Sequence, residues 1–221
     1  SLLGIGEMQS LIKPQLKYTY IPKTSFTDIP SIDPSDRIQE VHAVTYSFNH
    51  YLNSLSGSGV REISLLEVRQ SYGLSGSLNP SDLYKGSGSR FSDIDSTLTI
   101  TPTENIALST ESQISTSGEG LTGMKNAFTY SEPRLYYANV TQSYTKDLVN
   151  EVLLDLGASY WYLEGKYQVR YSFKDTMWID TLYQITYRPQ CWAVTLMLTQ
   201  SRRPRDTSIN LSVDLAGITS R

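Results

Sequence analysis

The sequence predicts an all-β chain, more specifically an antiparallel up-and-down transmembrane β-barrel of about twelve strands. Three observations carry this prediction. Tyrosine is common (16 residues) and charged residues make up only 19% of the chain, against about 25% in an average soluble protein. Apolar and polar residues alternate with a period of two in segments of about ten residues. The connections between these segments alternate in length, as the loops and turns of membrane barrels do.

The earlier part of the chain holds seven predicted strands with moderate alternation and no competing helical period. They comprise residues 11–22, 41–52, 62–71, 92–101, 106–117, 123–131 and 134–145. Five further strands, in which the alternation is clearest, comprise residues 154–162, 166–174, 177–188, 192–199 and 207–215. In the second of these, one face holds Tyr167, Val169, Tyr171 and Phe173. We therefore expect these four residues to face lipid.

Loop lengths predict which end of the strands lies outside the cell. Long polar connections follow the first strand, at residues 23–39, and the third, at residues 72–91. Tight turns are expected at residues 102–105, 132–133, 164–165 and 189–190, because they contain Pro, Gly or Asn. Membrane barrels place short turns in the periplasm and longer loops outside. An even strand count then places the end of the last strand on the periplasmic side.

The nature of the two faces distinguishes a membrane barrel from a soluble sandwich. A soluble sandwich keeps a charged exterior, whereas the polar faces here are mainly Ser, Thr, Gln and Gly. Five aromatic residues lie within about two residues of a turn, where the interfacial girdles of barrels occur. They are Trp161, Tyr162, Trp178, Tyr187 and Trp192. Both features favour the membrane barrel.

Composition narrows the possible partners and cofactors. The net charge of −3 and the isoelectric point near 5.4 give no electrostatic signature of nucleic-acid binding. Two His and one Cys cannot form a structural zinc site, and we expect no metal or other cofactor. No apolar run reaches the length of a membrane-spanning helix. The sequence shows no targeting segment and opens without Met, so we expect either a removed signal peptide or a longer parent protein.

Three segments resemble the LPS-assembly protein family LptD. The first is the tyrosine-rich run 16–22, followed by a polar loop with residues 28–30 and 35–38. The second, residues 187–194, resembles the family's Tyr-x-x-Cys-Cys-Trp segment, and the third, residues 209–218, resembles its closing strand. The resemblance extends over nearly the whole chain, and the Cys-Trp turn is its most specific point.

The resemblance implies a fold, a location in the bacterial outer membrane and a set of partners. Family members join a periplasmic β-jellyroll to a barrel of about 26 strands, plugged by the lipoprotein LptE and embedded in outer-membrane lipid. Residues 1–221 would be the C-terminal portion of that barrel domain, lacking the jellyroll and the first strands. Lipopolysaccharide would arrive over periplasmic Lpt bridge proteins and leave through a seam between the first and last strands. The last strand would be one lip of this lateral gate, with Thr207, Ile209, Asn210, Leu211, Ser212, Val213 and Asp214 as its residues.

One position departs from the family pattern. Members often carry two adjacent cysteines, each bridged to the N-terminal part, where this chain has Gln190 and Cys191. The resemblance therefore implies at most one such disulfide, and Cys191 is its candidate. Since the chain holds no second cysteine, the thiol is expected to be free here.

Inward-facing charges and two histidines complete the candidate residues. The charges of mixed sign are predicted to face the lumen, as a wet interior or as a path for the sugar part of lipopolysaccharide or a contact to the plug. They are Asp95, Glu111, Lys125, Asp155, Arg170, Lys174 and Asp180, together with Asp214 of the last strand. His42 and His50 share one face of one strand, but Ser and Thr are so abundant that a hydroxyl neighbour carries little information, and we expect no catalytic residue.

Three function classes follow from the sequence. The family resemblance favours a lipopolysaccharide translocon and no enzymatic activity. The barrel pattern alone equally permits a general diffusion porin, which would need a charged constriction loop. A barrel hydrolase, the third class, would need a constellation centred on His at one rim.

Overall fold

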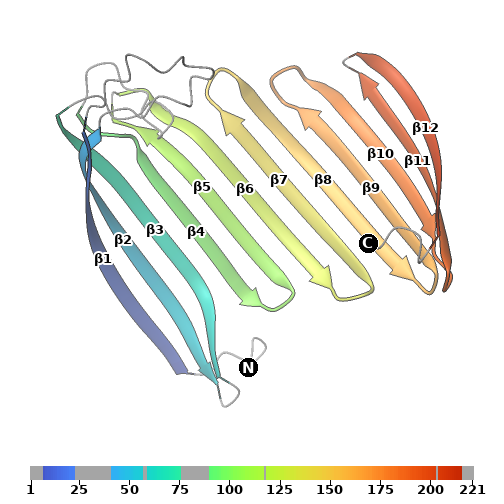
Figure 1. Ribbon diagram of the computed structural model, residues 1–221, viewed down its shortest axis with the longest axis horizontal. Helices are drawn as coiled ribbons and strands as arrows, with labels where there is room; N and C mark the ends of the chain where they lie inside the picture. Colours follow the sequence, from blue (N-terminus) through green and yellow to red (C-terminus); the bar gives the residue numbers. More distant parts are fainter. Residues whose placement is uncertain are drawn as a thin grey trace. The chain divides into compact units, whose positions relative to one another are not determined.

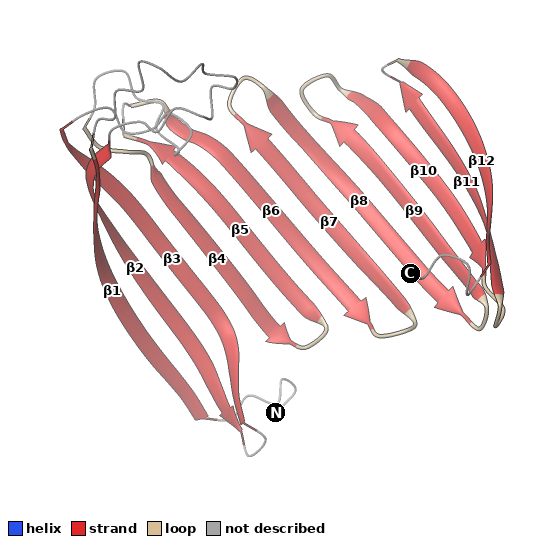
Figure 2. Cartoon of the chain, viewed as in Figure 1, coloured by secondary structure: helices blue, strands red, loops and turns tan. Residues whose placement is uncertain are grey.

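The structure, a computed structural model, describes residues 7–22, 41–56, 59–75, 90–116, 118–202 and 204–215 (Figure 1). These residues form twelve strands and no helix (Figure 2). The strands are β1 (Glu7–Ile21), β2 (Val41–Ser56), β3 (Gly59–Ser75), β4 (Ile94–Thr103), β5 (Ile106–Ser115), β6 (Gly120–Glu132), β7 (Tyr136–Thr145), β8 (Val149–Tyr160), β9 (Leu163–Ser172), β10 (Met177–Tyr187), β11 (Trp192–Arg202) and β12 (Arg205–Leu215).

The strands follow one another in a single antiparallel sheet in the order of the sequence. This confirms the all-β, up-and-down prediction and its twelve strands. β1 and β12 are the two edge strands of the sheet in this order. No helix among the described residues is both long and apolar enough to cross a membrane. The loop segments 28–30 and 35–38 of the family resemblance, and residues 216–218 of its closing strand, lie outside the described part of the chain.

The strands of the sheet divide into two compact units. Unit 1 comprises residues 1–100 and 110–123, and unit 2 comprises residues 101–109 and 124–221. Among the described residues only four hydrophobic side chains are buried, those of Ala43, Ile63, Val169 and Ala193. Many large apolar side chains are exposed instead. The strands are therefore held mainly by their backbone ladders and by cross-strand side-chain pairs rather than by a packed core.

One predicted turn was wrong. Residues 164–165 lie inside β9, and β8 turns into β9 at residues 161–162. Trp161 makes this turn with a φ of 53°, a left-handed conformation usually taken by Gly or Asn. Gly165 instead pairs with Ala158 and Ile185 in the sheet. A Cβ on Gly165 would lie 4.0 Å from the nearest atom beyond its chain neighbours, the Ala158 carbonyl oxygen, so close packing does not explain this glycine.

The earlier turn shifts the end of β9 as well. The strand was predicted to reach residue 174, but it ends at Ser172. Ser172 begins a hydrogen-bonded turn in which its hydroxyl oxygen accepts a bond from the backbone N–H of Asp175 at 3.1 Å. Phe173 and Lys174 therefore belong to the β9–β10 turn and not to a face of the strand.

Candidate functional site

One face of unit 2 is apolar from strand to strand. Cross-strand partners share a face, and the register sets Leu154 opposite Val169 and Val194 opposite Val213. Three of the four residues predicted to share a lipid face therefore do share one. The face comprises Val152, Leu154, Leu156, Tyr167, Val169, Tyr171, Tyr183, Ile185, Tyr187, Trp192, Val194, Leu196, Leu198, Ile209, Leu211, Val213 and Leu215. An uncovered apolar face of this extent is typical of contact with hydrocarbon.

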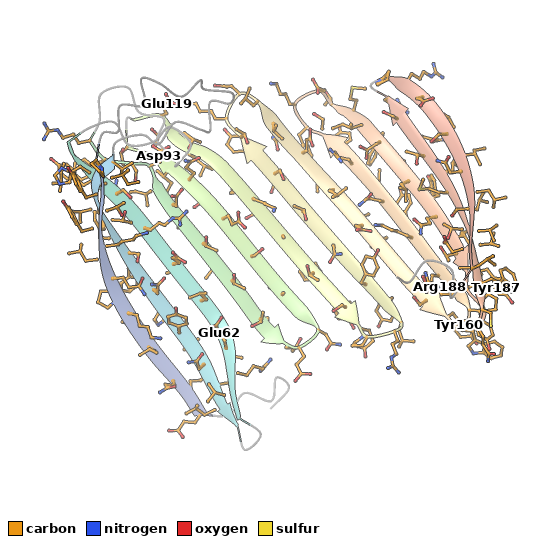
Figure 3. All side chains as sticks on the ribbon, in the orientation of Figure 1. Glu62, Asp93, Glu119, Tyr160, Tyr187 and Arg188 are labelled. Carbon is orange, nitrogen blue, oxygen red and sulfur yellow. The ribbon has the colours of Figure 1, made fainter. Side chains whose placement is uncertain are left out.

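Aromatic residues flank this apolar face at both ends. At one end the rings of Trp178 and Tyr171 have centroids 4.9 Å apart. At the other end the ring centroids of Tyr187 (labelled in Figure 3) and Trp192 are 5.5 Å apart. Trp178 and Tyr187 lie on the same strand, nine residues apart, or about 30 Å along it. A strand tilt of about 40° reduces this to a height of about 23 Å, close to the apolar band of about 25 Å in membrane barrels.

The opposite face of unit 2 is polar and carries cross-strand ion pairs. The pairs are Asp155–Lys166 at 3.7 Å, Arg170–Asp180 at 3.5 Å and Glu164–Arg188 at 3.8 Å (Figure 3 labels Arg188). The phenol of Tyr137 also donates a hydrogen bond to Asp155 at 3.1 Å. Since these side chains are partly exposed, each ion pair contributes no more than about 1 kcal/mol to stability. What they provide is a hydrated surface with both signs of charge.

Five of the predicted inward charges lie on this polar face of unit 2. Asp155, Arg170 and Asp180 form the pairs above, and Asp214 lies opposite Ala193. Lys125 is assigned to the same polar face by alternation. Its neighbour Asn126 donates a hydrogen bond to Gln142 on the apolar face at 3.3 Å, so Lys125 lies on the opposite face.

Lys174 lies apart from this group, in the β9–β10 turn. Its ammonium donates hydrogen bonds to the carbonyl oxygens of Asp147 and Leu148 in the β7–β8 turn, the latter at 3.2 Å. It therefore ties two neighbouring turns together.

Unit 1 also has a cross-strand ion pair on its polar face, between Asp95 and Arg69. Their side chains are 3.4 Å apart, and both residues lie opposite polar positions of the next strands. Glu111 is assigned to the same face by alternation, because its neighbour Ser112 contacts Ser96 at 2.8 Å and Ser96 is on the other face from Asp95.

Asp93 lies just before β4 and is 4% exposed. Burial is the main cause that raises the pKa of its carboxyl group above the ordinary value, and the charge of Glu119 adds to it (Figure 3). Hydrogen bonds from the backbone of Thr116 and the side chain of Ser115 oppose this shift. Asp93 therefore destabilises the folded chain whenever it is ionised.

The two histidines lie on the more apolar face of unit 1. His50 contacts the Ser10 hydroxyl at 2.8 Å and His42 contacts the Tyr18 hydroxyl at 3.0 Å, each across the β1–β2 pair. The ring of His42 also packs edge-on against those of Tyr18 and Tyr20. No group of three potential metal ligands occurs among the described residues.

β12 is exposed along nearly its whole length. Ten of its eleven residues are exposed, and Ser208 is half-buried. One edge pairs with β11 without interruption from Arg202↔Arg205 to Trp192↔Leu215. Ile209, Leu211 and Val213 lie on the apolar face, whereas Asn210, Ser212 and Asp214 lie on the polar face. Thr207 shares the apolar side at the other end of the strand, opposite Gln200.

Cys191 is an exposed free thiol in the connection between β10 and β11. This connection is fixed to the β8–β9 turn, because the backbone N–H of Arg188 donates a hydrogen bond to the carbonyl oxygen of Tyr162 at 2.7 Å. The ring of Tyr162 also packs against that of Tyr187. The thiol is therefore presented at a rim held by aromatic contacts.

Two features of the site were missed from the sequence. The ring of Tyr137 covers Gly157 on the polar face, where an added Cβ would lie 2.0 Å from Cε1 of the ring. Arg202 and Arg205 face each other across the tip of the β11–β12 hairpin. Both depend on strand register. For the contact between Tyr137 and Gly157, the only signal in the sequence was a glycine inside an alternating strand.

The family model described as LPS transport system D matches residues 3–188 of the chain. A search of curated proteins found no match. The family match extends from β1 through β10 and includes the ion pairs on the polar faces of both units.

Proposed function

Because the chain belongs to the LptD family, whose members transport lipopolysaccharide at the outer membrane, we propose that it forms part of the wall of the barrel that inserts lipopolysaccharide into the outer leaflet. β12 is one lip of a lateral seam in this proposal. The observation that carries it is the position of β12 at the edge of the sheet, with an apolar and a polar face. A strand of this kind contacts lipid on one side and a hydrated lumen on the other.

The polar faces supply the path for the sugars in this proposal. Hydroxyl-rich strands with paired charges, such as Asp155–Lys166 and Arg170–Asp180, offer donors and acceptors without a net charge that would hold the substrate. Lys125, Glu111 and Asp95 extend the same polar character to the other strands. An LptE-like lipoprotein would occupy the lumen against these residues. Periplasmic Lpt bridge proteins would deliver lipopolysaccharide through an N-terminal domain.

The whole chain then acts as one portion of the barrel domain. The long connections after β1 and β3 face outward, together with the turns after β5, β7, β9 and β11, and the turns after the even-numbered strands face the periplasm. Cys191 lies at the periplasmic rim in this orientation, and the proposal pairs it in a disulfide with a cysteine in the N-terminal part of the protein.

Crosslinking across the seam tests the proposal. Cysteines replacing Asn210 or Ser212 are paired with cysteines on the first strand of the whole barrel, in a Cys191→Ser background. Bridging should stop the appearance of lipopolysaccharide on the cell surface, and reduction should restore it. The matched control bridges Met197→Cys to Asn210→Cys, which face each other across β11 and β12 and need not separate. Undiminished export with the seam bridged would show that the substrate leaves by another route.

A further inference from the structure

The tip of the β11–β12 hairpin carries two arginines in an unfavourable arrangement. Arg202 and Arg205 are direct cross-strand partners and both are exposed. Like charges directly opposite each other destabilise a strand pair. Neither guanidinium forms an ion pair or hydrogen bond with another described residue, whereas Arg69, Arg170 and Arg188 each face a carboxylate within 4 Å. Such a pair is stabilised when an anion lies between the two groups.

The two arginines lie on the apolar face and not on the polar one. The β11–β12 register is uninterrupted, so Arg202 shares the face of Leu198 and Leu196, and Arg205 that of Ile209. The only carboxylate at this end of β12, that of Asp206, lies on the opposite face, paired with Ser201. On this face of β12 the side chains therefore change along the strand, from apolar at Ile209 through Thr207 to basic at Arg205.

The neighbouring strand marks the depth of this tip in the membrane. β10 pairs with β11 as far as Asp180↔Ser201, next to Arg202, and Trp178 lies two residues before Asp180. Trp178 belongs to the aromatic group at this end of the apolar face, with Tyr171. Aromatic belts lie at the level of the lipid headgroups. Arg202 and Arg205 therefore lie at headgroup level, beside hydrocarbon-facing residues.

The up-and-down order places this hairpin tip at the same end of the strands as the long connections after β1 and β3, which is the outer end in the proposed orientation. We propose that Arg202 and Arg205 bind the phosphate groups on the lipid part of lipopolysaccharide as it passes the seam into the outer leaflet. The inference rests on the proposed function, because it takes β12 as one lip of the seam. Guanidinium groups bind phosphate oxygens in a bidentate manner, and the apolar column of Ile209, Leu211 and Val213 fits the acyl chains of the same molecule.

Lipid binding to the whole protein, purified in detergent, tests this assignment without any need for export. The probes are bisphosphorylated lipid A, its dephosphorylated form and phosphatidylglycerol. The Arg202→Ala/Arg205→Ala variant should bind bisphosphorylated lipid A about tenfold more weakly than the unmodified protein. Its binding of dephosphorylated lipid A should be unchanged. The Gln200→Ala/Thr207→Ala variant, the next pair on the same face, should bind both forms normally.

A charge reversal keeps the result interpretable if the alanine variant folds poorly. Arg205→Glu creates a cross-strand ion pair with Arg202, which favours the hairpin, yet it should lose phosphate binding as fully as the double alanine variant. Unchanged binding of bisphosphorylated lipid A in either variant would overturn the assignment. An equal loss for phosphatidylglycerol would also overturn it, because the tip would then be a general site for anionic lipid. The two proposals can fail separately. If bridging the seam leaves export intact while Arg202 and Arg205 still select phosphorylated lipid A, the seam proposal is refuted and the phosphate-site proposal is retained.

Discussion

The contact between Tyr137 and Gly157 predicts a large effect from adding a single methyl group. In Gly157→Ala the new Cβ would lie 2.0, 2.5 and 2.8 Å from three atoms of the Tyr137 ring. Since carbon atoms in contact are about 3.5–4.0 Å apart, the ring must move by more than an ångström. That movement also breaks the hydrogen bond from the Tyr137 phenol to Asp155.

Two unfavourable contributions and one favourable contribution set the expected change in the free energy of unfolding. Overpacking costs about 1–3 kcal/mol, and the lost hydrogen bond adds about 1 kcal/mol. Replacing Gly by Ala within a strand returns about 0.5–1 kcal/mol. We therefore expect Gly157→Ala to lower the free energy of unfolding by about 1–3 kcal/mol. Urea unfolding of the purified protein in detergent, followed by tryptophan fluorescence, measures this difference.

A second background and a second glycine make the test specific. In a Tyr137→Ala protein the clash is absent, so Gly157→Ala should become neutral or slightly stabilising. Gly165→Ala, on the neighbouring strand, should be harmless in either background, because its Cβ meets only one atom, at 4.0 Å. An equal cost of Gly157→Ala with and without the tyrosine ring would refute the reasoning.

Three further predictions follow from the faces, the thiol and the buried carboxyl group. Val169→Arg places a charge on the apolar face and should cost about 2–4 kcal/mol, whereas Gln168→Arg on the polar face should cost little; equal costs would contradict the assignment of the faces. Reduction should change the gel mobility of the whole protein, and Cys191→Ser should abolish that change; if both proteins migrate alike with and without reductant, the thiol is unpaired. Asp93→Asn should be more stable than the parent at neutral pH, because the raised pKa of Asp93 makes its ionised form unfavourable in the folded chain. Acidification through that pKa protonates Asp93 and stabilises the parent, so the advantage of the asparagine variant should shrink as the pH falls; an advantage independent of pH would exclude titration of this group.

The faces of the strands could be predicted from the sequence, whereas their pairing could not. Alternation assigns Tyr167, Val169 and Tyr171 to one face regardless of where the preceding turn lies. Moving a two-residue turn by three positions, from 161–162 to 164–165, shifts the β8–β9 register by six residues. An even shift leaves every side chain on its face. It changes every β8–β9 cross-strand partner, however, and would separate Asp155 from Lys166, with which it forms an ion pair in the structure.

The misplaced turn has a physical cause that also limited the prediction of the site. Turn rules look for Gly, Asn or Asp at left-handed positions, but Arg134, Asp147, Trp161 and Thr176 all have a positive φ here. Three of these residues are not of the types that the rules recognise. The Arg170–Asp180 pair depends further on a register irregularity between Trp178 and Asp180, and no pattern in the sequence announces it.

The edge of β12 sets a limit on how a seam at this strand opens. About half of its backbone groups point away from β11, and each one left unsatisfied in hydrocarbon costs several kcal/mol. Opening the seam along its whole length into dry lipid would therefore have a very large unfavourable free energy. That free energy is much smaller where water or the polar part of the substrate forms hydrogen bonds with those backbone groups. Asn210, Ser212 and Asp214 keep the inner side of the strand hydrated, and the basic tip at Arg205 would draw phosphate and its water to the outer end. The strand is thus better suited to yield to an amphiphile that brings its own hydrogen-bonding groups than to the acyl chains of ordinary membrane lipid.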